Sequence, residues 1–132
     1  MVVHKSKNMS HSLEIKKTIE SVDWVLNTTE SAEEFCDYFD KTIDELKGKL
    51  SLKHISRTRN ALAFFFRDGL KLSKTEIATY FNRGSMHHNI KGILQTIDQD
   101  DNYALQVQYV VNRLVKRNAA KMQKMQEEID GS

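Results

Sequence analysis

The chain of 132 residues has no proline, five glycines and one cysteine. Without proline, long helices are not interrupted, and the many Lys, Glu, Leu, Ile and Ala residues favour helix formation. We therefore expect an all-α protein. Cys36 has no second cysteine with which to form an internal disulfide, and it lies in a helical pattern between Phe35 and Phe39, where a small apolar side chain packs well. This use of cysteine is typical of a reducing, intracellular compartment.

Long apolar runs are missing as well. No segment approaches the roughly 20 apolar residues that a membrane span requires, and the opening stretch MVVHKSKNMSHS lacks the continuous apolar core of a signal peptide. We expect a soluble, cytoplasmic protein without a membrane partner. With 39% hydrophobic residues, a chain of this length forms one domain with a modest core, which argues against a multi-domain enzyme.

Motifs for catalysis or metal binding are also absent. The chain contains no G-x-x-x-x-G-K-[ST] phosphate loop, no Cys-x-x-Cys and no His-Glu-x-x-His. His87 and His88 are adjacent, so on a helix they point about 100° apart and do not converge on a metal. His4 and His11 belong to an N-terminus whose residues 1–10 we expect to be flexible. No nucleophile has a base and an orienting group beside it, so we predict no enzymatic activity, no metal and no cofactor.

The net charge of +2 hides an uneven distribution along the chain. Residues 1–50 carry seven Lys/Arg against ten Asp/Glu, residues 51–100 eight against four, and residues 101–132 five against four. Positive charge is thus concentrated in the central block, where a phosphate-facing surface would need it, although a solvated helix face gives similar counts.

Apolar residues at helical spacing predict two helices in the first 50 residues. The stripe of the first, at roughly 11–27, consists of Ile15, Ile19, Val22 and Leu26. Ser31 and Glu34 have the spacing of a capping box and predict the start of a second helix, which continues to Leu50. Its other faces are acidic. We interpret residues 11–50 as a scaffold or as a helical pair that binds a protein partner.

The segment SLKHISRTRN, residues 51–60, is rich in basic side chains. These are Lys53, His54, Arg57 and Arg59. The stretch ALAFFF follows, and its three adjacent phenylalanines, at 64–66, cover most of a helix circumference and predict a largely enclosed helix. We expect a basic loop that leads into a buried helix.

Ser73 and Glu76 repeat the capping-box spacing, so a helix should begin at about Lys74. Its inward-facing residues are predicted to be Ile77, Ala78 and Phe81. The next residues, NRG at 82–84, predict a sharp turn.

Asn82 and Gly84 can adopt the positive φ angles that such a turn requires, and Ser85 is suited to cap the helix that follows. That helix is predicted to bury Ile90, Leu94 and Ile97, and to expose His87, His88, Asn89, Lys91 and Gln95. A capped helix, a tight turn and a second helix with polar donors near its start are typical of a helix–turn–helix, whose second helix reads base edges in the major groove.

A last helix is predicted from about Tyr103 to Glu128. Its approximate apolar stripe, interrupted at Asn118, consists of Val107, Val111, Leu114, Met122, Met125 and Ile129. The first half should pack on the core. Residues 118–132 form an extension that is either a solvated end, which we favour, or a weak dimerisation helix, so that a homodimer through residues 103–129 is the alternative.

The stretch RTRNALAFFFRDGLKLSKTEIATYFNRGSMHHNI resembles the C-terminal DNA-binding domain of the bacterial replication initiator DnaA. That domain has a basic loop ending in R-P-R-Q, an apolar helix, a segment like L-S-L-x-E-I-G-x-x-F and a signature like G-G-R-D-H-T-T-V. Here residues 57–60 (RTRN) stand for the first motif, and residues 72–78 (LSKTEIA) match the middle segment, with Phe81 on its phenylalanine. With one extra residue in the turn, residues 86–90 (MHHNI) lie on D-H-T-T-V, and His87 falls on the family histidine.

The resemblance covers roughly residues 53–117, and the signature departs from the family pattern. Ser85 and Met86 replace its arginine and aspartate, and His88 and Asn89 replace its threonines. The resemblance implies a compact bundle of five to six helices, DnaA C-terminal-like or Trp-repressor-like, with residues 51–117 as its DNA-binding core. It further implies an accessory replication or transcription regulator of bacterial or phage origin.

For a double-stranded DNA partner, the residue types suit two kinds of contact. Base contacts are expected from Ser85, His87, His88, Asn89 and Lys91, because amide and basic donors match adenine and guanine edges. Phosphate or minor-groove contacts are expected from Lys53, His54, Arg57, Arg59, Lys74 and Arg83. The rival hypothesis is a non-catalytic structural or interaction protein, such as a phage virion or host-takeover component. A positive surface joining residues 53–59 to 83–91 would favour DNA binding, and an exposed apolar patch would favour the rival.

Overall fold

The computed structural model describes residues 11–131, and within them the chain is all-helical, with seven helices and no strand. The helices are α2 (His11–Glu20), α3 (Thr28–Phe39), α4 (Ile43–Lys47), α5 (Lys53–Asp68), α6 (Lys74–Tyr80), α7 (His87–Gln99) and α8 (Asp101–Asp130). The predicted all-α class is confirmed. The expected flexible N-terminus, with His4, lies outside the described residues. No helix within residues 11–131 has both the length and the apolar character needed to cross a membrane.

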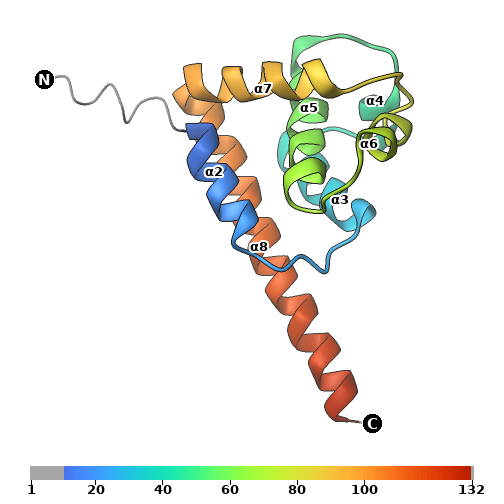
Figure 1. Cartoon of the computed structure of the whole chain (residues 1–132), viewed down its shortest axis with the longest axis vertical. Coiled ribbons are helices and arrows are strands. Elements are labelled where there is room, and N and C mark those ends of the chain that lie inside the picture. Colours follow the sequence, from blue (N-terminus) through green and yellow to red (C-terminus); the bar gives the residue numbers. More distant parts are fainter. Residues whose placement is uncertain (1–10, 132) are drawn as a thin grey trace, which may run out of the picture.

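Helix α5 is the centre of the fold and contacts α2, α3, α4, α6 and α7 (Figure 1). Its three phenylalanines, Phe64, Phe65 and Phe66, are at most 1% exposed, which confirms the prediction of an enclosed helix. Helix α8 is the longest helix of the described residues. Helices α2, α3 and α7 pack against its first half, and its C-terminal part extends away from the other helices.

The first helix is shorter than its apolar stripe predicts. Helix α2 ends at Glu20, and residues 23–27 have no regular secondary structure. The buried Asn118 of α8 explains this conformation, because its side chain bonds the backbone there. Its Oδ1 accepts from the N–H groups of Val25 (2.7 Å) and Leu26 (3.3 Å), and its Nδ2 donates to the carbonyl of Asp23 (2.8 Å).

The second helix starts one turn earlier than predicted. Its capping box is formed by Asn27 and Glu30, so the predicted box of Ser31 and Glu34 is wrong. Ser31 is buried within the helix, and its hydroxyl donates to the Asn27 carbonyl at 2.9 Å.

The predicted continuation of this helix to Leu50 is also wrong. Asp40 takes a left-handed conformation (φ 57°) and ends α3. Thr42 and Glu45 then form a second capping box, which starts the short helix α4.

The expected basic loop at 51–60 is largely helical. Lys53 is the first residue of α5, and the actual loop spans residues 48–52. The basic side chains of the segment therefore project from a helix, in directions set by its period.

The α6–α7 region follows its sequence pattern closely. Ser73 and Glu76 form the predicted capping box, and Asn82 has the positive φ (56°) expected of the turn. Gly84 has no positive φ, and the N-cap of α7 is Met86 in place of Ser85, whose Oγ accepts a weak bond from the His87 N–H at 3.4 Å. The buried face of α7 consists of Ile90, Ile93 and Ile97, with Leu94 only half-buried.

Candidate nucleic-acid interface

The segment from Gly69 to Ile97, which spans α6 and most of α7, has a strong excess of positive charge. It contains four basic residues, Lys71, Lys74, Arg83 and Lys91, and one acidic residue, Glu76. The Glu76 carboxylate accepts a hydrogen bond from the Ser73 N–H at 2.7 Å as part of the capping box. The only carboxylate of the segment thus belongs to the N-terminal capping box of α6.

The first two turns of α7 present hydrogen-bonding side chains to solvent. His87, His88 and Lys91 are exposed and Asn89 is half-buried, whereas Met86 and Ile90 are buried on the opposite side. The two imidazole rings lie 5.5 Å apart. Exposed Ser85 precedes them in the turn. Four of the five predicted base-contact residues are therefore exposed around the start of one helix.

Basic side chains from two other helices lie close to this helix start. The pKa of His87 is lowered by partial desolvation, then by the positive charges of Lys74, His88, Lys91 and Arg67. A depression of about 290 Å³ separates the three helices and is lined by Arg67, Leu72, Ser73, Lys74, Ile77, Met86, His87 and Ile90. We call Arg67, Lys74, His87, His88 and Lys91 the α7 basic group. Sequence reasoning missed Arg67, because it belongs to the helix assigned to the core.

Lys74, His87, His88 and Lys91 form no ion pair with another residue of 11–131. Arg67 does, since it binds Asp68 through Nε (2.8 Å) and Nη2 (3.0 Å). Most of the α7 basic group is therefore not neutralised by the described part of the chain.

The loop at 48–52 brings further basic residues near the α6–α7 turn. Arg83 donates through Nη2 to the Gly48 carbonyl (2.8 Å) and through Nη1 to the Phe81 carbonyl (2.9 Å), so it ties the turn to the loop. Lys49 in this loop, and Lys53 and His54 at the start of α5, are exposed. The turn thus connects the α7 basic group with the loop that precedes α5.

The arginines predicted to contact phosphates have partners within the protein. Arg59 is 2% exposed, and its guanidinium donates to the carbonyls of Leu46 (2.6 Å), Leu50 (3.1 Å), Glu45 (3.4 Å) and Gly48 (3.4 Å). It cannot reach a phosphate while these bonds are in place. Arg57 is half-buried, lies 3.4 Å from the Asp100 carboxylate and stacks 5.0 Å from the Tyr103 ring centroid. Of the residues expected to bind phosphates, Lys53, His54 and Lys74 remain exposed.

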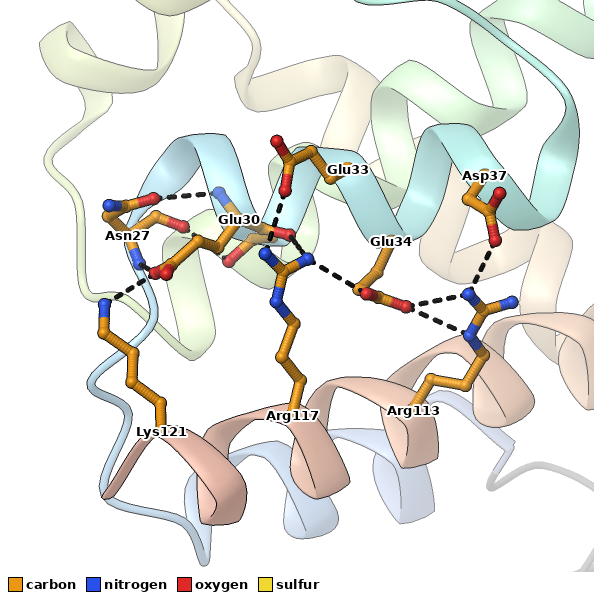
Figure 2. Close-up of polar contacts among 9 residues, drawn as sticks. Asn27, Glu30, Glu33, Glu34, Asp37, Arg113, Arg117 and Lys121 are labelled. Carbon is orange, nitrogen blue, oxygen red and sulfur yellow. Dashed lines mark hydrogen bonds and ion pairs between the residues drawn. The ribbon is translucent and has the colours of Figure 1, made fainter. Parts of the chain in front are cut away.

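The acidic face of α3 contacts a row of basic residues on α8 (Figure 2). Arg113 binds Glu34 (3.0 Å) and Asp37 (2.7 Å), and Arg117 binds Glu33 (2.9 Å) and Glu34 (3.0 Å). Lys121 binds Glu30 at 2.7 Å. We call these contacts the α3–α8 ladder. Four of the ten acidic residues in 1–50 are thus paired with α8 within the molecule.

Neither metal-binding nor thiol chemistry finds support in the described geometry. Residues 11–131 contain no group of three His, Cys, Asp or Glu side chains that could hold a metal ion. Burial, and then the charge of Glu45, raises the pKa of the half-buried Cys36 to about 11, so its thiol is protonated at neutral pH.

Comparison of the chain with protein-family models, with curated proteins and with solved structures finds no match in any of the three. The candidate interface is therefore interpreted from its own charge and geometry.

Proposed function

We propose that the protein binds double-stranded DNA through α6 and α7, which act as a helix–turn–helix with α7 in the major groove. The observation that carries this proposal is the α7 basic group, which is largely unpaired and surrounds the exposed start of α7. The first residues of a recognition helix are the ones that meet base edges in this kind of docking. The resemblance of the sequence to the DnaA C-terminal domain supports the same placement.

The side chains divide into two roles under this proposal. His87, His88 and Lys91 donate to base edges, and Asn89 lies at the margin of the contact. Lys74 and Arg67 meet phosphates on one side of α7, and the exposed Lys53 and His54 meet them near the loop. Arg59 supports that loop from inside. The protein is then a non-catalytic accessory regulator of replication or transcription, of bacterial or phage origin.

The test is a fluorescence-anisotropy titration of random-sequence duplex DNA at about 50 and about 200 mM salt. The variant Lys74→Gln/Lys91→Gln removes two charges of the α7 basic group. The control Lys116→Gln/Lys124→Gln removes two exposed lysines from α8. Each phosphate contact contributes about 0.9 to the slope of log K against log salt. The first variant removes the Lys74 phosphate contact and the Lys91 base contact, so it should reduce that slope by about 1, and the control should leave it unchanged.

Two results would defeat the proposal. One is no binding by the wild-type protein at about 50 mM salt. The other is an equal decrease of the salt slope in both double variants, which would mean that DNA binding depends on the overall charge of the protein and not on the α7 surface.

A second candidate function is a non-catalytic structural or interaction component. It is favoured by a row of exposed apolar side chains at the end of α8, namely Met122, Met125 and Ile129. Such a role would leave the protein unable to bind DNA in the titration, yet able to associate through α8.

A further inference from the structure

The last part of α8 is a helix with no other helix beside it. Every residue from 122 to 130, which we call the tail, is exposed, and the tail extends away from the helices that pack on the first half of α8 (Figure 1). Nine residues are too few to form a stable helix in water by themselves. The tail is therefore a helical extension whose structure another surface could stabilise.

The tail has the apolar stripe of a helix that packs. Met122, Met125 and Ile129, which follow each other at steps of three and four residues, are 43%, 42% and 66% exposed. Steps of three and four keep side chains on one face and match the seam of a coiled coil. The stripe continues that of Val107, Val111 and Leu114, which is buried against the other helices, with the buried Asn118 at the boundary.

Charge along this part of α8 is divided into two halves. Residues 116–124 contain four basic side chains and no acidic one, and residues 125–130 contain three acidic side chains and no basic one. The basic residues are Lys116, Arg117, Lys121 and Lys124, and the acidic ones are Glu127, Glu128 and Asp130. Arg117 and Lys121 are held by α3 carboxylates in the α3–α8 ladder and Lys116 lies outside the tail, so the tail itself offers Lys124. In an antiparallel pair centred near Met125, Lys124 of one copy faces Glu127 of the other, twice over by symmetry. A parallel copy would bring like charges together.

We propose that the tail pairs with the tail of a second copy in an antiparallel, two-fold symmetric arrangement. The seam is formed by Met122, Met125 and Ile129 of both copies, and the bodies of the two copies lie at opposite ends of the pair. This proposal does not depend on DNA binding and is tested without DNA.

The small area of contact between the two tails makes the proposed dimer weak. Two tails of about three turns bury less than the roughly 1,200 Å² that marks the lower end of stable interfaces. We expect a monomer at about 1 µM protein and a substantial dimer fraction at about 300 µM, which corresponds to a dissociation constant in the range of tens to hundreds of micromolar.

Sedimentation equilibrium over this concentration range tests the pairing. The variant Met122→Gln/Met125→Gln/Ile129→Gln keeps helix-compatible side chains and should be monomeric throughout. The control Leu13→Gln/Leu50→Gln/Leu105→Gln changes three other exposed apolar residues and should dimerise like the wild type. A wild-type monomer at about 300 µM overturns the proposal, and so does a dimer that survives the tail substitutions.

Disulfide cross-linking tests the orientation in a Cys36→Ala background. Met125 lies near the middle of the tail, so Met125→Cys should cross-link with itself in an antiparallel pair. Ile129→Cys should not cross-link with itself but should do so with Met122→Cys. Efficient self-cross-linking of Ile129→Cys indicates a parallel pair and overturns the antiparallel arrangement.

Discussion

Asn118 provides the strongest test of how α8 organises the N-terminal segment. It is 1% exposed, and its amide satisfies three backbone groups of residues 23–26. The substitution Asn118→Leu keeps the approximate volume of the side chain but removes all three hydrogen bonds. The measured loss should therefore report the polar contacts and not a cavity.

The magnitude follows from the burial of the three backbone groups. An unsatisfied buried donor or acceptor costs about 1–3 kcal/mol. The Leu26 N–H is buried and should cost that amount, whereas the Val25 N–H and the Asp23 carbonyl are part-buried, so water can replace roughly half of their loss. We expect Asn118→Leu to lower the free energy of unfolding by about 2–6 kcal/mol.

Urea unfolding followed by circular dichroism measures this loss, with Asn112→Leu as the matched control. Asn112 is exposed on the same helix and bonds Gln108, so its substitution should change stability by less than about 0.5 kcal/mol. Amide hydrogen exchange adds a local readout, since the Val25 and Leu26 amides should exchange faster in the Asn118 variant. Equal stability of the two variants, with unchanged exchange at Val25 and Leu26, would show that the Asn118 amide does not hold residues 23–26 in place.

Two further predictions concern basic residues. Arg59→Lys should lower the free energy of unfolding by about 2–4 kcal/mol, because an ammonium group cannot span the carbonyls that the guanidinium joins. The same variant should leave the salt slope of DNA binding unchanged. A smaller slope in a stably folded variant would instead make Arg59 a DNA contact. DNA affinity should rise as the pH falls below 6.5, because the lowered pKa of His87 keeps its imidazole neutral above that pH and protonation adds a positive charge to the interface. In anisotropy titrations, the rise should be smaller for His87→Gln than for the wild type. An identical pH profile for the two proteins would contradict the prediction.

Local patterns in the sequence were sufficient for part of the fold. The run of phenylalanines at 64–66 could only be accommodated by an enclosed helix, and the structure buries all three. Ser73 and Glu76 had no competing cap nearby, and their box starts α6 as predicted. In both cases the interactions that decide the structure lie within a few residues of each other.

Other boundaries depend on residues far away in the chain. Asn27–Glu30 and Ser31–Glu34 both have capping potential, and the sequence does not say which pair is used. The contact between Val25 and Asn118, 93 residues apart, holds the preceding segment out of a helix and favours the earlier cap. The apolar stripe of residues 15–26 could not reveal this, because Leu26 is buried without belonging to a helix.

The roles of the basic residues were hardest to predict, because residue type does not distinguish a structural arginine from an exposed one. Arg57 and Arg59 are two positions apart, so on a helix they point in different directions. Arg59 faces the end of α4, whose last carbonyls have no partner within that helix and need donors from elsewhere. Arg67, which no pattern indicated, lies beside His87 only because α5 ends next to the start of α7.

Pairing within the molecule, more than the number of charges, decides which face is positive. Helix α8 carries five basic residues, but Arg113, Arg117 and Lys121 are held by carboxylates of α3 in the α3–α8 ladder. Such exposed pairs contribute little stability, about 0–1 kcal/mol each. Their larger effect is on the electrostatic field, because α8 neutralises four acidic residues of α3. In contrast, the segment from Gly69 to Ile97 has one carboxylate for four basic side chains, and that carboxylate caps α6. Lys74 and Lys91 therefore leave uncompensated positive charge at the start of α7, in a chain whose net charge is only +2.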